Sequence, residues 1–247
     1  HLISSGRSKS RFIGLFLVLL LALGHAQWGA AASADATVIG LGSLNGPNGY
    51  RIAGVEDGDR AGSSISSAGD VNGYGLDDFI ICAPSANPES KQGAGEVYVI
   101  FGGAGNPAAL SLSALNGSNG FRIRGADFND ELGRSVSGGD INGDVYADLL
   151  IGSPGADPTE DLEETGSVYV IFGRPSFPAT LSVNSLNGNN GFRINGIATD
   201  NRTGMSISNA GDVNGDGFDD VLIGAPDAAA GNKNGVGQVY VVFGNSS

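Results

Sequence analysis

Hydrophobic residues occur along this chain in short runs that recur at a nearly constant interval. Three continuous apolar runs lie at 79–81, 149–151 and 221–223. Runs of this length predict strands that are buried on both faces. Before each run, single apolar residues alternate with serine, as expected for a half-buried strand; these residues are Ile65, Val136 and Ile207.

Longer segments repeat with the same spacing. The sequence NGPNGYRIAG begins at Asn45, and close copies begin at Asn116 and Asn187, each 71 residues further on. The motif VYV[IV]FG recurs with the same 71-residue spacing and predicts a third strand per repeat, at 97–101, 168–172 and 239–243. The segment at 121–123 and its equivalents predict a shorter fourth strand.

Four short strands per repeat, in tandem, are typical of β-propeller blades. We therefore predict an all-β fold of three four-stranded blades, with a linker at 35–44 followed by repeats at 45–115, 116–186 and 187–247. Closed propellers usually have about 4–8 blades, so three blades indicate an incomplete or arc-like propeller, a fragment, or blades supplied by another copy. The open strand edges of an arc favour self-association.

The N-terminal segment has the layout of a secretory signal peptide. A basic stretch that ends at Arg11 precedes an apolar run at 12–23, and small residues around Ala32-Ser33-Ala34 offer a cleavage site. We predict a signal peptide at 1–34; cleavage after Ala26 and an uncleaved membrane anchor are the alternatives. The expected location is secreted, extracellular or at the cell surface, with no membrane insertion after cleavage.

Charge and composition exclude several classes of function. The net charge of −13 disfavours nucleic acid and anionic lipid, whose phosphates attract Lys and Arg. Both histidines, His1 and His25, lie in the predicted signal peptide, so the mature chain can form neither a histidine-based catalytic site nor a histidine-ligated zinc site. Cys82 is the only cysteine, which rules out an internal disulfide. We expect no enzymatic activity, although carboxylate chemistry of the glycosidase kind stays open.

An acidic loop joins the first two predicted strands of each repeat. The three loops read DVNGYGLDD from Asp70, DINGDVYAD from Asp140 and DVNGDGFDD from Asp212. Oxygen donors fall at positions 1, 3, 5 and 9, with a main-chain carbonyl expected at position 7. The candidate calcium ligands are Asp70, Asn72, Leu76 and Asp78 in the first loop, Asp140, Asn142, Asp144, Tyr146 and Asp148 in the second, and Asp212, Asn214, Asp216, Phe218 and Asp220 in the third.

This spacing predicts a Ca²⁺ site because alternate side chains of a curled loop can point to one centre, and the glycine at position 4 permits the curl. Calcium accepts about 6–8 hard oxygen ligands. Two like charges about 4 Å apart cost roughly 1 kcal/mol in water and about 4 kcal/mol near a protein surface, so the carboxylates favour a counter-ion. The alternative is that Asn-Gly and Asp-Gly simply form hairpin turns, but a turn does not require donors at four fixed offsets.

Two of the loops depart from the shared pattern. Tyr74 replaces the central carboxylate of the first loop, which leaves its calcium binding open. In the second loop Val145 stands where the others have Gly75 and Gly217, and we expect strain in that turn.

Each repeat resembles an FG-GAP repeat, the blade of the integrin alpha-subunit propeller. The segments that carry the resemblance are SVSGGDINGDVYADLLIGSP, ending at Pro154, and SISNAGDVNGDGFDDVLIGAP, ending at Pro226. The family's phenylalanine-glycine pair has drifted to Ala61-Gly62, Leu132-Gly133 and Thr203-Gly204, and Cys82 replaces a glycine of the signature. The resemblance implies calcium in the loops of an extracellular recognition or cell-adhesion domain, with a protein or glycan ligand. Integrin propellers have seven such repeats, so neither a ligand nor a beta-subunit partner is carried over.

Two other functions are compatible with the sequence. One is an accessory, non-catalytic domain of a secreted hydrolase, because FG-GAP blades also accompany such enzymes. The other is a structural surface or matrix protein without a specific ligand.

Overall fold

The computed structural model describes residues 39–103, 109–159 and 163–246. The chain divides into two units, His1–Ser43 and Leu44–Ser247. In the first unit the described part is 39–43, which holds the 3₁₀ turn η1 (Leu41–Ser43). The predicted signal peptide lies outside the described residues. Within the described residues, none of the helices has both the length and the apolar character needed to cross a bilayer.

Four types of strand recur in the second unit, at the places that the sequence predicts. The first type comprises β2 (Ser64–Gly69), β7 (Ser135–Gly139) and β12 (Ser206–Gly211). The second type comprises β3 (Asp78–Ala83), β8 (Asp148–Ser153) and β13 (Asp220–Ala225). The third type comprises β4 (Glu96–Ile100), β9 (Ser167–Ile171) and β14 (Gln238–Val242). The fourth type comprises β1 (Arg51–Ala53), β6 (Gly120–Arg124) and β11 (Gly191–Asn195).

The structure also contains short elements that the sequence does not predict. Two three-residue strands, β5 (Ala109–Ser111) and β10 (Thr180–Ser182), follow the third strand of a blade. The 3₁₀ turns are η2 (Pro88–Ser90), η3 (Leu112–Ala114) and η4 (Val183–Ser185).

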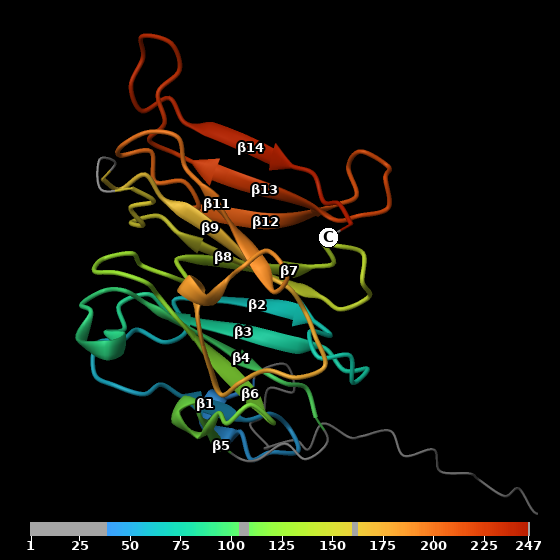
Figure 1. The fold of residues 1–247 in the computed structure, drawn as a ribbon. Helices are drawn as coiled ribbons and strands as arrows, with labels where there is room; N and C mark the ends of the chain where they lie inside the picture. The colour runs from blue at the N-terminus through green and yellow to red at the C-terminus, as the bar shows by residue number, and fades with distance from the viewer. Residues whose placement is uncertain (1–38, 104–108, 160–162, 247) are drawn as a thin grey trace, which may run out of the picture. The chain divides into compact units, whose positions relative to one another are not determined.

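The strands form antiparallel blades in tandem (Figure 1). The first blade has the order β2-β3-β4-β6, with β10 added in parallel at its outer edge, and the second has the order β7-β8-β9-β11. The third blade consists of β12, β13 and β14, while β1 pairs with β5 in a separate parallel ribbon. The predicted all-β fold of propeller-type blades without a closed ring is therefore confirmed. The fourth strand of each complete blade comes from the start of the next sequence repeat.

The hydrophobic core lies between neighbouring blades. The first-type strands lie side by side, β2 next to β7 and β7 next to β12. Phe121 and Ile123 of the first blade belong to the same buried cluster as Leu149 and Ile151 of the second. The faces of a middle blade are thus covered from both sides, which explains why its second strand is a continuous apolar run.

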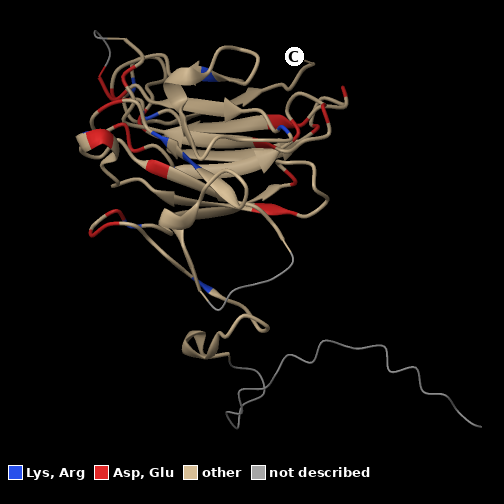
Figure 2. Ribbon diagram, turned by 60° about the horizontal axis from the view of Figure 1, so that its bottom comes forward, with Lys and Arg blue, Asp and Glu red and all other residues tan. Residues whose placement is uncertain are grey.

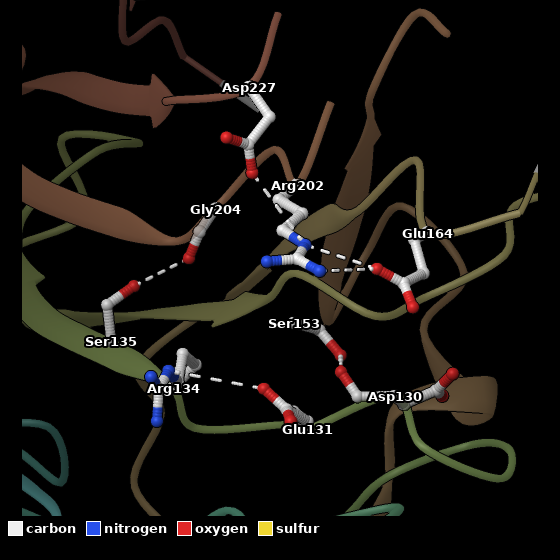
Figure 3. A network of polar contacts seen from close by, with 9 residues as sticks. All are labelled: Asp130, Glu131, Arg134, Ser135, Ser153, Glu164, Arg202, Gly204 and Asp227. Carbon is white, nitrogen blue, oxygen red and sulfur yellow. Dashed lines mark hydrogen bonds and ion pairs between the residues drawn. The ribbon is translucent and has the colours of Figure 1, made fainter. Parts of the chain in front are cut away.

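Polar contacts link the second and third blades at the end where the first-type strands begin (Figure 3). The hydroxyl of Ser135 donates to the carbonyl oxygen of Gly204 over 2.8 Å. The guanidinium of Arg202 lies 3.0 Å from a carboxylate oxygen of Glu164 and 3.7 Å from one of Asp227. Because the aspartate loops follow the other ends of the first-type strands, these contacts lie at the end of the blades opposite to the loops.

Candidate metal centre

The three aspartate loops lie at one end of the blades, where each joins a first-type strand to a second-type strand. Figure 2 shows that acidic residues gather mainly in loops, whereas the strands are largely uncharged. We number the positions of each loop from 1 to 9, starting at Asp70, Asp140 and Asp212. The hydrogen bonds are nearly the same in all three copies, so the second loop serves as the reference.

The aspartate at position 1 folds the loop around its own carboxylate. In the second loop Oδ1 of Asp140 accepts hydrogen bonds from the N–H groups of Gly143 (2.8 Å) and Asp144 (3.1 Å), and Oδ2 accepts one from Val145 (3.2 Å). Asp70 and Asp212 accept the equivalent three bonds. An aspartate that satisfies successive backbone donors is a strong local turn signal, and it explains how residues of the loop itself can produce the curl.

Positions 4 and 6 both require left-handed backbone. At position 4 the φ angles of Gly73, Gly143 and Gly215 are 74°, 74° and 81°. At position 6 Val145 is held at a φ of 72°, where the other two loops have glycine. A β-branched residue in this region is strained, so the strain predicted from the sequence is confirmed.

Asparagine at position 3 and aspartate at position 5 are joined to each other in the second and third loops. The amide Nδ2 of Asn142 donates to Oδ2 of Asp144 (2.9 Å), and Asn214 donates to Asp216 in the same way (2.7 Å). In the first loop Tyr74 cannot accept this bond, and Nδ2 of Asn72 is buried without a partner. The replacement of one carboxylate therefore leaves a buried donor unsatisfied.

The aspartates at position 9 are buried and bind the backbone, which the sequence did not predict. Oδ2 of Asp148 accepts from the N–H of Ile141 (2.9 Å), and Oδ1 accepts from the N–H of Gly173 (2.9 Å), just beyond β9. Asp78 and Asp220 make the equivalent pairs of bonds. These side chains thus connect the loop to the end of the third strand of the same blade.

Burial and neighbouring charge change the protonation of two position-9 aspartates. Burial raises the pKa of Asp148 to about 7, although the N–H groups of Gly173 and Ile141 act against it. The nearby carboxylates of Asp144 and Asp140 raise this pKa further. Burial also raises the pKa of Asp78, and the charge of Asp70 adds to the effect. A raised carboxyl pKa marks a place where an added positive charge would be favourable.

Position 7 contacts the preceding blade. A Cβ added to Gly73 would lie 2.4 Å from the ring of Tyr146, and one added to Gly143 would lie 2.5 Å from the ring of Phe218. Each aromatic side chain therefore packs on the position-4 glycine of the loop before it. Leu76, the equivalent residue of the first loop, is exposed. Only the main-chain carbonyls of these residues were predicted as ligands, and this packing role was missed because it joins residues of two repeats.

The side chains of the second and third loops fit a hard cation in their chemistry. Each offers three carboxylates and one amide oxygen, and calcium prefers oxygen ligands. In the described part of the chain, however, no group of three or more His, Cys, Asp and Glu side chains is placed to hold a metal ion by itself. An ion in these loops would therefore also need the asparagine and main-chain oxygens.

Comparison with known families identifies the repeats. The family model described as FG-GAP repeat matches residues 61–100, 132–171 and 203–242, each of which spans the first three strands of a blade and its aspartate loop. This chain is an FG-GAP repeat protein.

The proteins that this chain is similar to include integrin alpha subunits and a phospholipase D. It is 34% identical to integrin alpha-IIb of Mus musculus over 128 residues, which is 51% of this chain and 11% of the integrin. It is 30% identical to integrin alpha-V of Gallus gallus over 186 residues, 73% of this chain and 15% of the integrin. It is 31% identical to phosphatidylinositol-glycan-specific phospholipase D of Bos taurus over 188 residues, 76% of this chain and 21% of the enzyme. The matches thus cover only a small part of each relative's length.

Proposed function

We propose that this FG-GAP repeat protein is a secreted, calcium-binding module for extracellular recognition or cell adhesion. The observation that carries the proposal is the threefold recurrence of one loop conformation, in which oxygen donors stand at positions 1, 3 and 9 of every loop and at position 5 of the second and third loops. The similarity to integrin alpha subunits supports the same function.

A bound calcium ion would supply positive charge among the clustered carboxylates. In the second loop Asp140, Asn142, Asp144 and Asp148, with the carbonyl of Tyr146, would hold it. The buried Asp148 would then stay ionised at neutral pH, because an opposite charge favours the charged form of a carboxyl group. The protein's own contribution is a loop already curled by position 1 and fixed to the third strand by position 9.

Calorimetric titration of the chelator-treated chain with calcium tests this function. We expect binding at the second and third loops and a melting temperature that rises with calcium, since a ligand that binds only the folded state stabilises it. The variants Asp144→Asn and Asp216→Asn should each remove one site, whereas Asp57→Asn, at an exposed residue outside the three loops, should remove none. No heat at millimolar calcium and no effect of chelator on melting would refute the proposal.

The first loop offers a gain-of-function test. Tyr74→Asp restores the central carboxylate and gives the buried Nδ2 of Asn72 an acceptor. The variant should bind one more calcium ion than the parent chain. Tyr74→Asn serves as the control, because it supplies an acceptor for Asn72 without the charge.

Secretion and recognition need separate experiments. N-terminal sequencing of the exported protein should show cleavage after Ala34 or Ala26; an intact N-terminus would favour a membrane anchor. Arrays of extracellular proteins and glycans, probed with and without calcium, should reveal ligands that depend on calcium. Binding to nothing on either array would favour a purely structural surface protein.

A second candidate is an accessory domain of a secreted hydrolase, with no catalytic role of its own. The similarity to phosphatidylinositol-glycan-specific phospholipase D, over 76% of this chain, favours it. Sequencing the complete gene distinguishes the two, because a catalytic domain in the same reading frame would support the accessory role.

A further inference from the structure

The outer face of the third blade carries apolar side chains that are buried in the other two blades. Val239 and Val241 of β14 are 71% and 49% exposed. Their equivalents in β4 and β9 are completely buried, at 0%; they are Val97, Val99, Val168 and Val170. Val213 and Phe243 are exposed apolar residues of the third blade as well. A contiguous apolar face of this kind marks an interaction surface.

The edge of β14 also lacks the neighbour that its equivalents have. Each of β4 and β9 pairs with a second-type strand on one edge and with a fourth-type strand on the other. Among the described residues β14 pairs only with β13. An unpaired edge with exposed valines can accept a further strand.

The strand β1 has the complementary free edge. In the first blade β6 lies between β4 and β10, antiparallel to one and parallel to the other. In the same way β1 is parallel to β5, but its other edge has no partner strand among the described residues. Within the described residues, the edge of β1 that corresponds to the β4-facing edge of β6 is therefore open to a further strand.

We propose that two copies of this chain associate head to tail, with β1 of one copy pairing antiparallel with β14 of the other. The five-stranded sheet β10-β6-β4-β3-β2 is the template, and the intermolecular sheet has the order β5-β1 from one copy and β14-β13-β12 from its partner. In the template Val97 lies opposite Ile123 and Val99 opposite Phe121. When the same register is applied with the 71-residue repeat, Val239 of one copy lies opposite Ile52 of its partner.

The loops of the two copies are complementary at the same interface. A Cβ added to Gly215 meets nothing within 4 Å, whereas Gly73 and Gly143 are each covered by an aromatic ring of the next loop. Leu76 is the exposed residue of the first loop that corresponds to those rings. In the assembly Leu76 of one copy covers Gly215 of its partner. Ile65, which is 70% exposed although its equivalent Val136 is only 8% exposed, faces the same junction.

Two copies joined in this way at both ends contain six blades. Closed propellers have about 4–8 blades, so a ring of two copies has a common size. Head-to-tail interfaces close into rings where the rotation allows it and otherwise form open chains. The inference goes beyond calcium binding, because neither the strand pairing nor the apolar face requires an ion.

Light scattering and cross-linking of the purified chain test the assembly, at near-physiological salt because the net charge of −13 opposes association. We expect twice the mass of one chain. Val241→Lys should abolish the dimer. Phe128→Lys, at a residue that is 62% exposed in the segment between β6 and β7 and lies outside the proposed interface, should leave the dimer intact.

Mixing two variants, each with one introduced cysteine in addition to the buried Cys82, then fixes the register. Val239→Cys on one copy and Ile52→Cys on the other should form an intermolecular disulfide, because directly opposite Cβ atoms lie about 4.5–5.5 Å apart. Val239→Cys with Arg51→Cys should not, since adjacent residues of a strand point to opposite faces. A monomer, or a dimer that survives Val241→Lys and does not cross-link, would overturn the proposal. Open chains of larger mass with the in-register cross-link would retain the pairing and overturn the two-copy ring.

Discussion

The second and third aspartate loops make the same hydrogen bonds but lie in different surroundings. In the second loop Asn142 is buried and Asp140 half-buried, whereas Asp212 and Asn214 of the third loop are exposed. The second loop is covered by residues that follow β14, including Asn245, whose N–H donates to the carbonyl of Ile141. The comparison shows that the loop conformation is encoded within nine residues, whereas its burial is supplied by the next blade.

The pKa values of two loop aspartates also differ according to whether the side chain is buried or exposed. Asp148, at the base of the covered second loop, has a pKa raised to about 7, mainly by burial. Asp212, on the exposed rim of the third loop, has a lowered pKa because the N–H of Gly217 and neighbouring backbone donors stabilise its charge. Backbone donors therefore lower the pKa of the exposed carboxylate of Asp212, whereas the two N–H groups that bind Asp148 do not offset the desolvation of its buried carboxylate.

The largest expected difference between the two loops concerns position 9. Asp148→Ala would leave two N–H groups without their acceptor, and one of them belongs to the buried Ile141. Each unsatisfied buried donor costs about 1–3 kcal/mol, so we expect a loss of about 3 kcal/mol in the free energy of unfolding. Asp220→Ala should cost about half as much, since Val213 is exposed and water can reach its N–H. Urea denaturation in the presence of chelator measures both, and equal losses would contradict the role of the covering blade.

The junctions between blades allow a test by pH. Asp130 lies at the junction between the first and second blades, and its pKa is raised to about 6 mainly by burial. Asn201 stands at the equivalent place in the junction between the second and third blades. In the unfolded chain an aspartate releases its proton near pH 4. Between about pH 4 and pH 6 the folded state therefore binds more protons than the unfolded state. Stability must fall as pH rises through this window, by up to about 3 kcal/mol from this residue.

The variant Asp130→Asn isolates this contribution from those of Asp148 and Asp78, which also have raised pKa values. We expect its free energy of unfolding to decline less than that of the parent between pH 4 and pH 6. Denaturation curves at several pH values, with chelator present, provide the comparison. Parallel pH profiles for the two proteins would show that Asp130 does not titrate as its burial implies.

The position-4 glycines of the second and third loops differ in the space that surrounds them. Both Gly143 and Gly215 have positive φ angles, so alanine costs about 1–2 kcal/mol at either place. Only at Gly143 would the added Cβ collide with a ring, that of Phe218 at 2.5 Å. Gly143→Ala should therefore cost about 1 kcal/mol more than Gly215→Ala. Thermal melting in the Val241→Lys background, where a second copy does not cover Gly215, should show this order; the reverse order would contradict it.

The strands could be predicted from the sequence because their signals are local. The apolar runs and the 71-residue spacing placed the four strand types, and the aspartate pattern placed the loops. The three residues of β5 carry no periodicity of their own, so it could not be predicted. The roles of Asp148 and Gly73 depend on Gly173 and Tyr146, which lie 25 and 73 residues further along the chain. Contacts between separate segments require the three-dimensional register, which a repeat does not reveal.

The smallest expected effect concerns position 6, where the second loop differs from the third in its own residues. Val145 is 86% exposed at a φ of 72°, so its side chain contributes strain and little packing. Val145→Gly removes a strain of about 1–2 kcal/mol and costs about 0.5–1 kcal/mol in the entropy of the unfolded chain. We expect a net gain of about 1 kcal/mol, or an increase of roughly 2–4 °C in melting temperature.

The control for this variant is Val213→Gly. Val213 is also an exposed valine of an aspartate loop, but its φ is not positive. Glycine there should lower the melting temperature, because it brings the entropic cost without relieving any strain. The two valine-to-glycine changes should thus shift melting in opposite directions. A decrease in both would show that the second loop accommodates Val145 without strain, and that the turn is as relaxed as those with glycine at position 6.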